Sequence, residues 1–146
     1  MGYVERSIII KASRQSTYLL AKDMEAYPKY MPNVESVMVV KRRGNTTVTE
    51  WETDNDGTPI TWTEEDTFDD EVYSIKYRLL EGDLDKFEGE WTFESLEEGT
   101  TKITLTCEYD FGIPELTNMI GPTLEEKIGN NCEEILQGIK TQLEIA

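Results

Sequence analysis

The sequence predicts an α+β fold: a curved seven-stranded antiparallel sheet around one long C-terminal helix, with two short helices between strands 1 and 2. From residue 34 to residue 111, apolar and polar residues alternate in segments that turn residues separate, which is typical of antiparallel strands with one covered face. From residue 113 to residue 143, apolar residues recur every three or four positions, which indicates an amphipathic helix. With 146 residues, we expect residues 1–146 to form a single domain.

The N-terminal segment predicts one strand and two short helices. Tyr3–Lys11 is rich in Ile, Val and Tyr, as strands are. Ser13 is a candidate N-cap for the first helix, because its hydroxyl can accept a hydrogen bond from a free backbone N–H. Met24–Tyr30 forms the second, which Pro28 and Pro32 limit, since proline cannot donate a backbone hydrogen bond.

Six further strands follow, separated by turns. We expect them over residues 34–41, 46–53, 60–68, 72–80, 87–94 and 103–111. Asp56-Gly57 indicates a hairpin, because Asp-Gly readily adopts the positive φ angles of tight turns. Gly89 lies between Phe87 and Trp91 on the covered phase of its strand, which favours either a bend or a cavity wall.

The C-terminal helix is expected to cover the concave face of the sheet. Gly121-Pro122 interrupts its apolar stripe, so we expect either a kink or a new helix with Pro122 in its first turn.

Composition excludes several classes of function. The chain has 14 Lys and Arg, 30 Asp and Glu and no His, with a net charge of −16. We therefore expect no nucleic-acid partner and no attraction to anionic membranes. The lack of His removes His-based triads, zinc sites and haem ligation. Basic residues gather in the first 43 positions and residues 50–71 contain no Lys or Arg, which we assign to two faces of one domain.

Cysteine usage and hydropathy favour the cytoplasm. Cys107 and Cys132 are the two cysteines, so CxxC motifs and four-thiolate metal sites are excluded. The N-terminus lacks the apolar run of a signal peptide and no stretch approaches the length of a membrane span, so we expect a cytoplasmic protein without stable membrane insertion. Glu52–Gly57 imitates the start of a calcium loop but lacks its final Glu, so no metal or cofactor is expected.

Several motifs together resemble a known family. They are residues 27–37 (YPKYMPNVESV), Trp62 with Glu64 and Asp66, residues 82–91 and residues 109–114 (YDFGIP). The chain resembles the polyketide cyclase/dehydrase and coenzyme Q-binding protein branch of the START-like (SRPBCC, helix-grip) superfamily, which also includes ribosome-association toxin relatives. The resemblance implies a deep apolar cavity between sheet and long helix that holds a lipid, an isoprenoid quinone or an aromatic polyketide-like ligand.

The candidate ligand-binding residues are aromatic and apolar side chains on the covered phases of strands and helix. They are Tyr30, Met31, Trp51, Trp62, Tyr77, Phe87, Trp91, Cys107, Tyr109, Ile120, Leu124 and Ile128. Flat rings that line a cavity can hold a flat or chain-like ligand, and Tyr or Trp can add hydrogen bonds. The alternative is ordinary packing between sheet and helix.

Two carboxyl groups are weak catalytic candidates. Glu64 and Asp66 share a strand phase with Trp62, so a regular strand points them inward, where burial would raise the pKa of either group. Tyr77 or Tyr109 would then donate a hydrogen bond. A bulge that turns both carboxyls outward is the alternative. Arg6 either anchors an anionic or carbonyl group at the cavity mouth or lies in solvent.

We therefore expect a binding or carrier protein for a hydrophobic small molecule, more readily than an enzyme. One alternative is a cyclase or dehydratase that uses a cavity carboxylate and a tyrosine. Another is a protein-interaction module of the toxin-relative type, with a partner bound through the segment Tyr27–Met31.

Overall fold

The computed structural model describes residues 2–55, 58–82, 84–97, 99–110 and 114–144, with backbone alone for residues 55, 58 and 114–124. The elements in chain order are β1 (Gly2–Ile10), α1 (Arg14–Lys22), the 3-10 helix η1 (Met24–Lys29), β2 (Val34–Arg43), β3 (Thr46–Asn55), β4 (Thr58–Asp69), β5 (Ser74–Gly82), β6 (Lys86–Ser95), β7 (Thr101–Asp110) and α2 (Pro114–Glu144).

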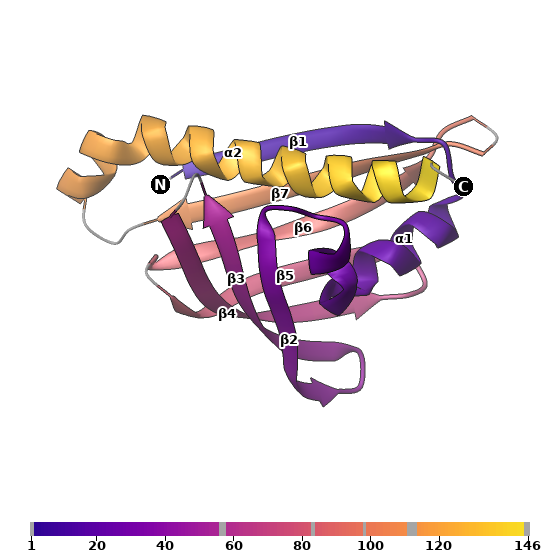
Figure 1. Cartoon of the computed structure of the whole chain (residues 1–146), viewed down its shortest axis with the longest axis horizontal. Coiled ribbons are helices and arrows are strands. Elements are labelled where there is room, and N and C mark those ends of the chain that lie inside the picture. The colour runs from indigo at the N-terminus through magenta and orange to yellow at the C-terminus, as the bar shows by residue number, and fades with distance from the viewer. Residues whose placement is uncertain (1, 56–57, 83, 98, 111–113, 145–146) are drawn as a thin grey trace.

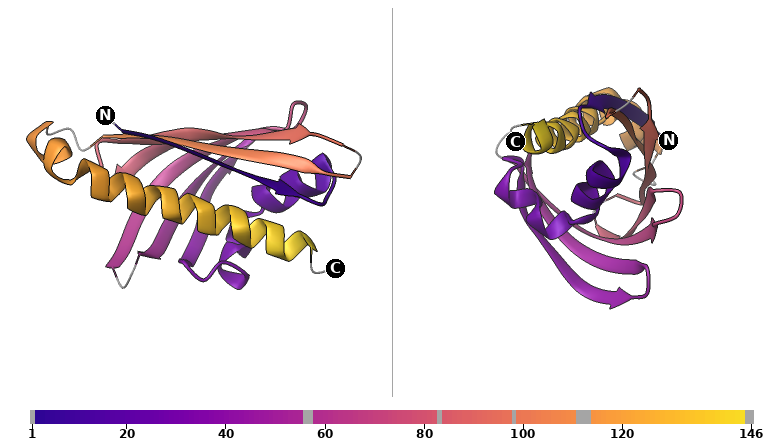
Figure 2. Two further views of the ribbon diagram at one scale, coloured as in Figure 1. Left: turned by 90° about the horizontal axis from the view of Figure 1, so that it is seen from above. Right: turned by 90° about the vertical axis from the view of Figure 1, so that its right-hand side faces the viewer.

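The strands form one antiparallel sheet in the spatial order β1-β7-β6-β5-β4-β3-β2. The sheet is curved, and α2 runs along its concave side against β1 and β7 (Figure 1). The short helices α1 and η1 lie on the same side, where α1 contacts β6 and η1 contacts β2 (Figure 2). The predicted α+β fold is confirmed.

The first helix begins where the sequence predicts. Ser13 has extended backbone angles, and its Oγ accepts a hydrogen bond from the backbone N–H of Ser16 at 3.1 Å. This satisfies one of the free N–H groups at the helix start. The predicted second helix is the 3-10 helix η1, which contains Pro28.

The C-terminal helix is continuous, so the alternative of a new helix at Gly121-Pro122 is wrong. One helix runs from Pro114 to Glu144. Figure 2 shows a bend within its N-terminal part. Proline removes one backbone hydrogen bond without ending a long helix, and a bend is the usual result.

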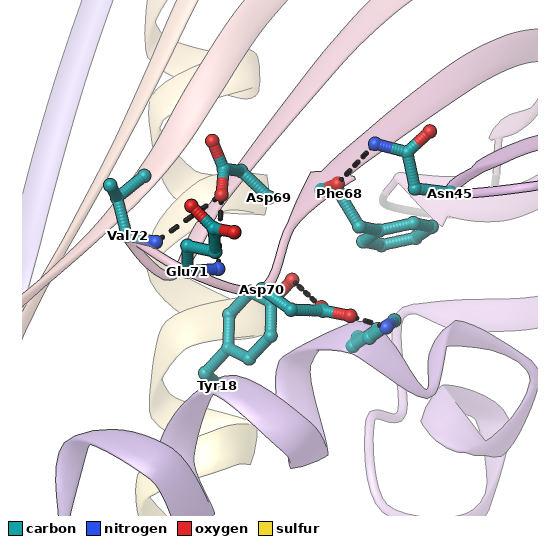
Figure 3. Close-up of polar contacts among 8 residues, drawn as sticks. Tyr18, Asn45, Phe68, Asp69, Asp70, Glu71 and Val72 are labelled. Atoms are coloured by element: carbon teal, nitrogen blue, oxygen red, sulfur yellow. Dashed lines mark hydrogen bonds and ion pairs between the residues drawn. The ribbon is translucent and has the colours of Figure 1, made fainter.

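The strand that we expected to start at residue 72 starts at Ser74. Val72 is 59% exposed and Tyr73 has a φ of 55°, so both belong to the β4–β5 turn. The Oδ1 atom of Asp69 accepts hydrogen bonds from the backbone N–H groups of Glu71 and Val72 at 3.0 and 3.2 Å (Figure 3). A carboxylate that caps a turn in this way competes with strand formation.

Two side chains of α1 hold this turn. The Tyr18 hydroxyl donates to Oδ1 of Asp70 at 2.6 Å, and Nζ of Lys22 contacts the same oxygen at 2.9 Å. Figure 3 shows Tyr18 beneath the turn, with its hydroxyl directed at Asp70. The hydrogen bonds from Tyr18 and Lys22 lower the pKa of the Asp70 carboxyl. This contact fixes α1 against the sheet.

Candidate functional site

One end of the concave face is filled by the protein's own aromatic side chains. Tyr18, Tyr27, Trp91 and Phe93 are at most 4% exposed. The rings of Tyr18 and Phe93 meet edge to face at 5.4 Å, and the Trp91 and Phe93 rings stack at 6.4 Å. Beneath α1 and η1, these aromatic residues therefore form an ordinary packed core, which was the alternative to a ligand-binding cavity.

The other end of the concave face carries apolar side chains that the described residues only half bury. They are Trp62, Leu84 and Phe87, which we call the apolar floor. The Trp62 ring stacks on the buried Trp51 ring at 5.4 Å with 6° between planes, and Phe87 lies 5.7 Å from Trp62. Figure 1 places the N-terminal part of α2 at this same end, where β3 ends and β1 begins.

A polar strip lies beside the apolar floor, on the concave face of β3 and β4. The strands pair Trp51 with Trp62, then Thr49 with Glu64, then Thr47 with Asp66. Glu64 is 4% exposed and Asp66 is fully buried. The two carboxyl groups thus lie inside the protein, next to the stacked tryptophans.

Hydrogen bonds from neighbouring side chains hold both carboxyl groups. The Trp62 indole N–H donates to Oε1 of Glu64 at 2.7 Å. The Thr49 hydroxyl donates to Oδ2 of Asp66 at 2.7 Å and accepts from the Trp51 indole at 2.8 Å. Thr49 and Thr47 belong to the site although sequence reasoning missed them. Their shared phase with Trp51 was visible, but Thr is common on either face of a strand.

The side chains of Glu64 and Asp66 point inward because the bulge between β4 and β5 lies in β5. The β4–β5 register shifts between Thr63 and Glu64, because β5 has one extra residue there, Leu80. Leu80 is 45% exposed. Since the extra residue is in β5, β4 keeps its alternation, and the alternative of a bulge that turns both carboxyls outward is wrong.

Burial raises the pKa of both carboxyl groups. For Glu64 the rise is large, because the charge of Asp66 adds to the loss of solvent, and the Trp62 hydrogen bond opposes it only in part. For Asp66 burial again dominates, while the hydrogen bond from Thr49 and the adjacent Glu64 carboxyl lower the pKa. Two adjacent buried carboxyls cannot both ionise easily. Glu64 is therefore the group that keeps its proton.

The Tyr77 hydroxyl is already committed to the main chain. It donates to the backbone oxygen of Thr106 at 2.5 Å. A Cβ atom on Gly89 would lie 1.9 Å from that oxygen and 2.7 Å from the Tyr77 hydroxyl oxygen. Gly89 therefore lets the Tyr77 side chain cross β6, which explains a residue that the sequence marked only as a bend or a cavity wall.

The remaining predicted residues are mostly core. Tyr109 is 2% exposed, and its ring lies against the backbone of Gly2. Cys107 and Ile128 are buried between the sheet and α2. The side chains of Ile120 and Leu124 lie outside the described residues.

The segment Tyr27–Met31 closes the core. Tyr27 and Met31 are buried, and Met31 packs against Gly138 of α2. Tyr30 is half-buried. The exposed side chain within this segment is Lys29, so a partner would meet little of its apolar surface in this conformation.

Arg6 pairs with α2. Its Nε lies 2.9 Å from Oε1 of Glu133, and its guanidinium lies against Gly129. Among the residues whose side chains are described, no group of three or more Cys, Asp or Glu is placed to hold a metal ion. In the described part of the chain, no helix is both long enough and apolar enough to span a membrane.

The fold defines the class of protein. A long C-terminal helix against a curved seven-stranded antiparallel sheet, with two short helices after the first strand, is the START-like (helix-grip) architecture. Residues 10–135 match the family described as polyketide cyclase / dehydrase and lipid transport. The chain belongs to this family.

Individual relatives span nearly the whole chain. A crystal structure of TTHA0849 from Thermus thermophilus is 32% identical, with a TM-score of 0.89 over 97% of both chains. The Zhui aromatase/cyclase from Streptomyces sp. R1128 is 22% identical, with a TM-score of 0.87 over 98% of this chain and 93% of the other. The ribosome association toxin RatA of Vibrio cholerae is 25% identical over 130 residues, which cover 89% of this chain and 90% of the toxin.

Proposed function

We propose that the protein binds a hydrophobic small molecule in a cavity between the apolar floor and the N-terminal half of α2, as a carrier or binding protein. The ligand would be a lipid, an isoprenoid quinone or an aromatic polyketide-like compound. We place this action in the cytoplasm, with Cys107 and Cys132 reduced, as the free thiols of both residues allow.

The half-buried state of Trp62, Leu84 and Phe87 carries this proposal. At the other end of the concave face, the aromatic rings of Tyr18, Tyr27, Trp91 and Phe93 are at most 4% exposed, so these three half-buried side chains differ from them. A ligand that covers them would gain about 25 cal/mol for each Å² of apolar surface removed from water. Flat rings would also stack on Trp62, whose other face Trp51 occupies.

Mass spectrometry of an organic extract of the purified protein tests the proposal, followed by titration with quinones, long-chain alcohols, fatty acids and polycyclic aromatics. We expect at least one class to bind, and Trp62→Ala and Phe87→Ala to weaken binding. Met38→Ala is the matched control, because Met38 is 60% exposed on β2. No copurified ligand and no binding by any class would contradict the proposal.

A cyclase or dehydratase activity is the second candidate, and the buried carboxyl pair favours it. Glu64 has a raised pKa and could act as a general acid beside a bound ligand. Tyr77 is a poor donor for this role because its hydroxyl proton already goes to Thr106. Loss of turnover of a polyketide-like substrate in Glu64→Gln, with ligand affinity retained, would support it. Unchanged turnover would exclude Glu64 from the chemistry.

Association with a macromolecular partner is the third candidate, and the similarity to the toxin favours it. Lys41, Arg42 and Arg43 are exposed at the tip of the β2–β3 hairpin, which projects from the sheet (Figure 2). Within the described part of the chain none of the three forms an ion pair. Charge reversal at all three should abolish cosedimentation with ribosomal particles; equal cosedimentation would remove this candidate.

A further inference from the structure

Glu64 and Asp66 place an acidic pair directly beside the apolar floor. The indole N–H of Trp62, a floor residue, donates to Glu64 at 2.7 Å, so the first carboxyl is one hydrogen bond from the surface that would meet a ligand. Asp66 follows two positions further along the same concave phase of β4. The carboxyl pair is therefore the buried polar group next to any ligand that stacks on Trp62.

Among the side chains that the structure describes, no Lys or Arg forms an ion pair with either carboxyl. The ion pairs of these cations involve other acids. Arg6, which lies on the concave phase of β1, is held by Glu133 of α2 at 2.9 Å. The other ionisable groups that interact with Glu64 and Asp66 are themselves neutral or acidic: Tyr27, Tyr77 and Cys107 inside the protein, and Glu65 on the opposite face of the sheet.

We propose that Glu64 and Asp66 select against anionic ligands, so that the molecule bound on the apolar floor is uncharged at the end beside this pair. The inference rests on the proposed binding function and names its ligand class: alcohols, ketones, quinones and related neutral compounds, rather than fatty acids or phospholipids. An anion there would lie near the Asp66 carboxylate in a region of low dielectric, where repulsion is much stronger than in water, and no described Lys or Arg pairs with either carboxyl to offset it. A neutral ligand avoids that cost.

Two pairs of matched ligands test this at neutral pH. Hydroxymethyl-anthraquinone and anthraquinone carboxylate share one ring frame, while tetradecanol and tetradecanoate share one chain. We expect the neutral member of at least one pair to bind at least about tenfold more tightly than its anionic partner. If the anion binds equally or better, the inference is overturned while the binding function stands. If no member of either pair binds, the proposed function fails and the inference with it.

A pair of variants separates the carboxyl pair from the overall charge of the protein. Asp66→Asn keeps the side-chain size but removes the ionised carboxylate, so it should raise affinity for the anionic ligands. Glu65→Gln is the matched control, because Glu65 lies on the same strand but pairs with Arg78 at 3.0 Å on the outer face. An equal gain in Glu65→Gln would attribute selectivity to net charge and overturn the proposal. If a variant does not fold, the comparison of neutral and anionic ligands on the native protein still decides the proposal.

Discussion

The Trp62 indole N–H lies 2.7 Å from Oε1 of Glu64. This contact joins a half-buried ring to a carboxyl that is 4% exposed. It therefore places an ionisable group at the boundary between the polar strip and the apolar floor. In the proposed binding mode, the same tryptophan would contact the ligand with its ring and Glu64 with its indole N–H.

Glu64 should make the protein less stable as pH rises. Its pKa is higher in the folded than in the unfolded state, so the folded state binds more protons between the two pKa values. The free energy of unfolding then falls as pH rises from about 4.3 through the raised pKa, by about 1.4 kcal/mol for each unit of difference. Glu64→Gln should flatten this slope in urea unfolding across pH, whereas Glu65→Gln should keep it. Because the raised pKa of Asp66 leaves a smaller slope of the same sign, only an undiminished slope in Glu64→Gln would contradict the buried acid.

Gly89→Ala should destabilise the protein strongly. The added Cβ atom would lie 1.9 Å from the backbone oxygen of Thr106, so β6 and β7 must separate or Tyr77 must move. We expect a loss of about 2–3 kcal/mol or more in urea unfolding. At Gly44 nothing lies within 4 Å, but φ is +61°, so Gly44→Ala should cost only about 1 kcal/mol. Equal losses would show that β6 and β7 are not in close contact.

Tyr18→Phe should loosen α1 from the β4–β5 turn. It removes the hydrogen bond to Asp70 but keeps the buried ring and its contacts with Tyr73 and Phe93. We expect a modestly lower melting temperature and faster amide hydrogen exchange in α1, because local opening becomes easier. Arg43→Gln, at an exposed position in the β2–β3 hairpin, should change neither. Unaltered exchange in α1 would mean that the hydroxyl does not hold the turn.

The two thiols should be unreactive in the folded protein. Burial raises the pKa of Cys107 and raises that of Cys132 to about 12, so almost no thiolate is present at neutral pH. An aromatic disulfide reagent should label neither cysteine until urea unfolds the protein. Rapid labelling of either thiol without denaturant would show that the sheet and α2 separate readily.

The element order followed directly from the sequence, because alternation and helical spacing are local signals. Ser13 was recognisable as a cap for the same reason. The β4–β5 turn was misjudged because Val72 and Tyr73 have the composition of a strand. The hydrogen bonds that Asp69 accepts from the turn backbone, and the one that Tyr18 of α1 donates to Asp70, make this segment a turn.

The site was less predictable than the fold. The phase of Glu64 and Asp66 was visible, but the choice between inward carboxyls and a bulge depends on which strand carries the extra residue. That residue is Leu80 of β5, a property of strand pairing and not of β4 alone. Likewise, aromatic residues with the same alternating pattern along their strands differ in burial: Trp91 is buried, whereas Trp62 is half-buried. Their difference depends on what α1, η1 and α2 cover.

Fluorine NMR of the protein labelled with fluorotryptophan tests the ligand surface most directly, because the chain has three tryptophans. Trp62 belongs to the apolar floor, Trp51 stacks beneath it, and Trp91 packs between Tyr27 and Phe93. When a neutral anthraquinone or long-chain alcohol binds, the Trp62 resonance should shift most, Trp51 less and Trp91 hardly at all. Binding that shifts Trp91 alone, or that leaves Trp62 unchanged, would contradict the account.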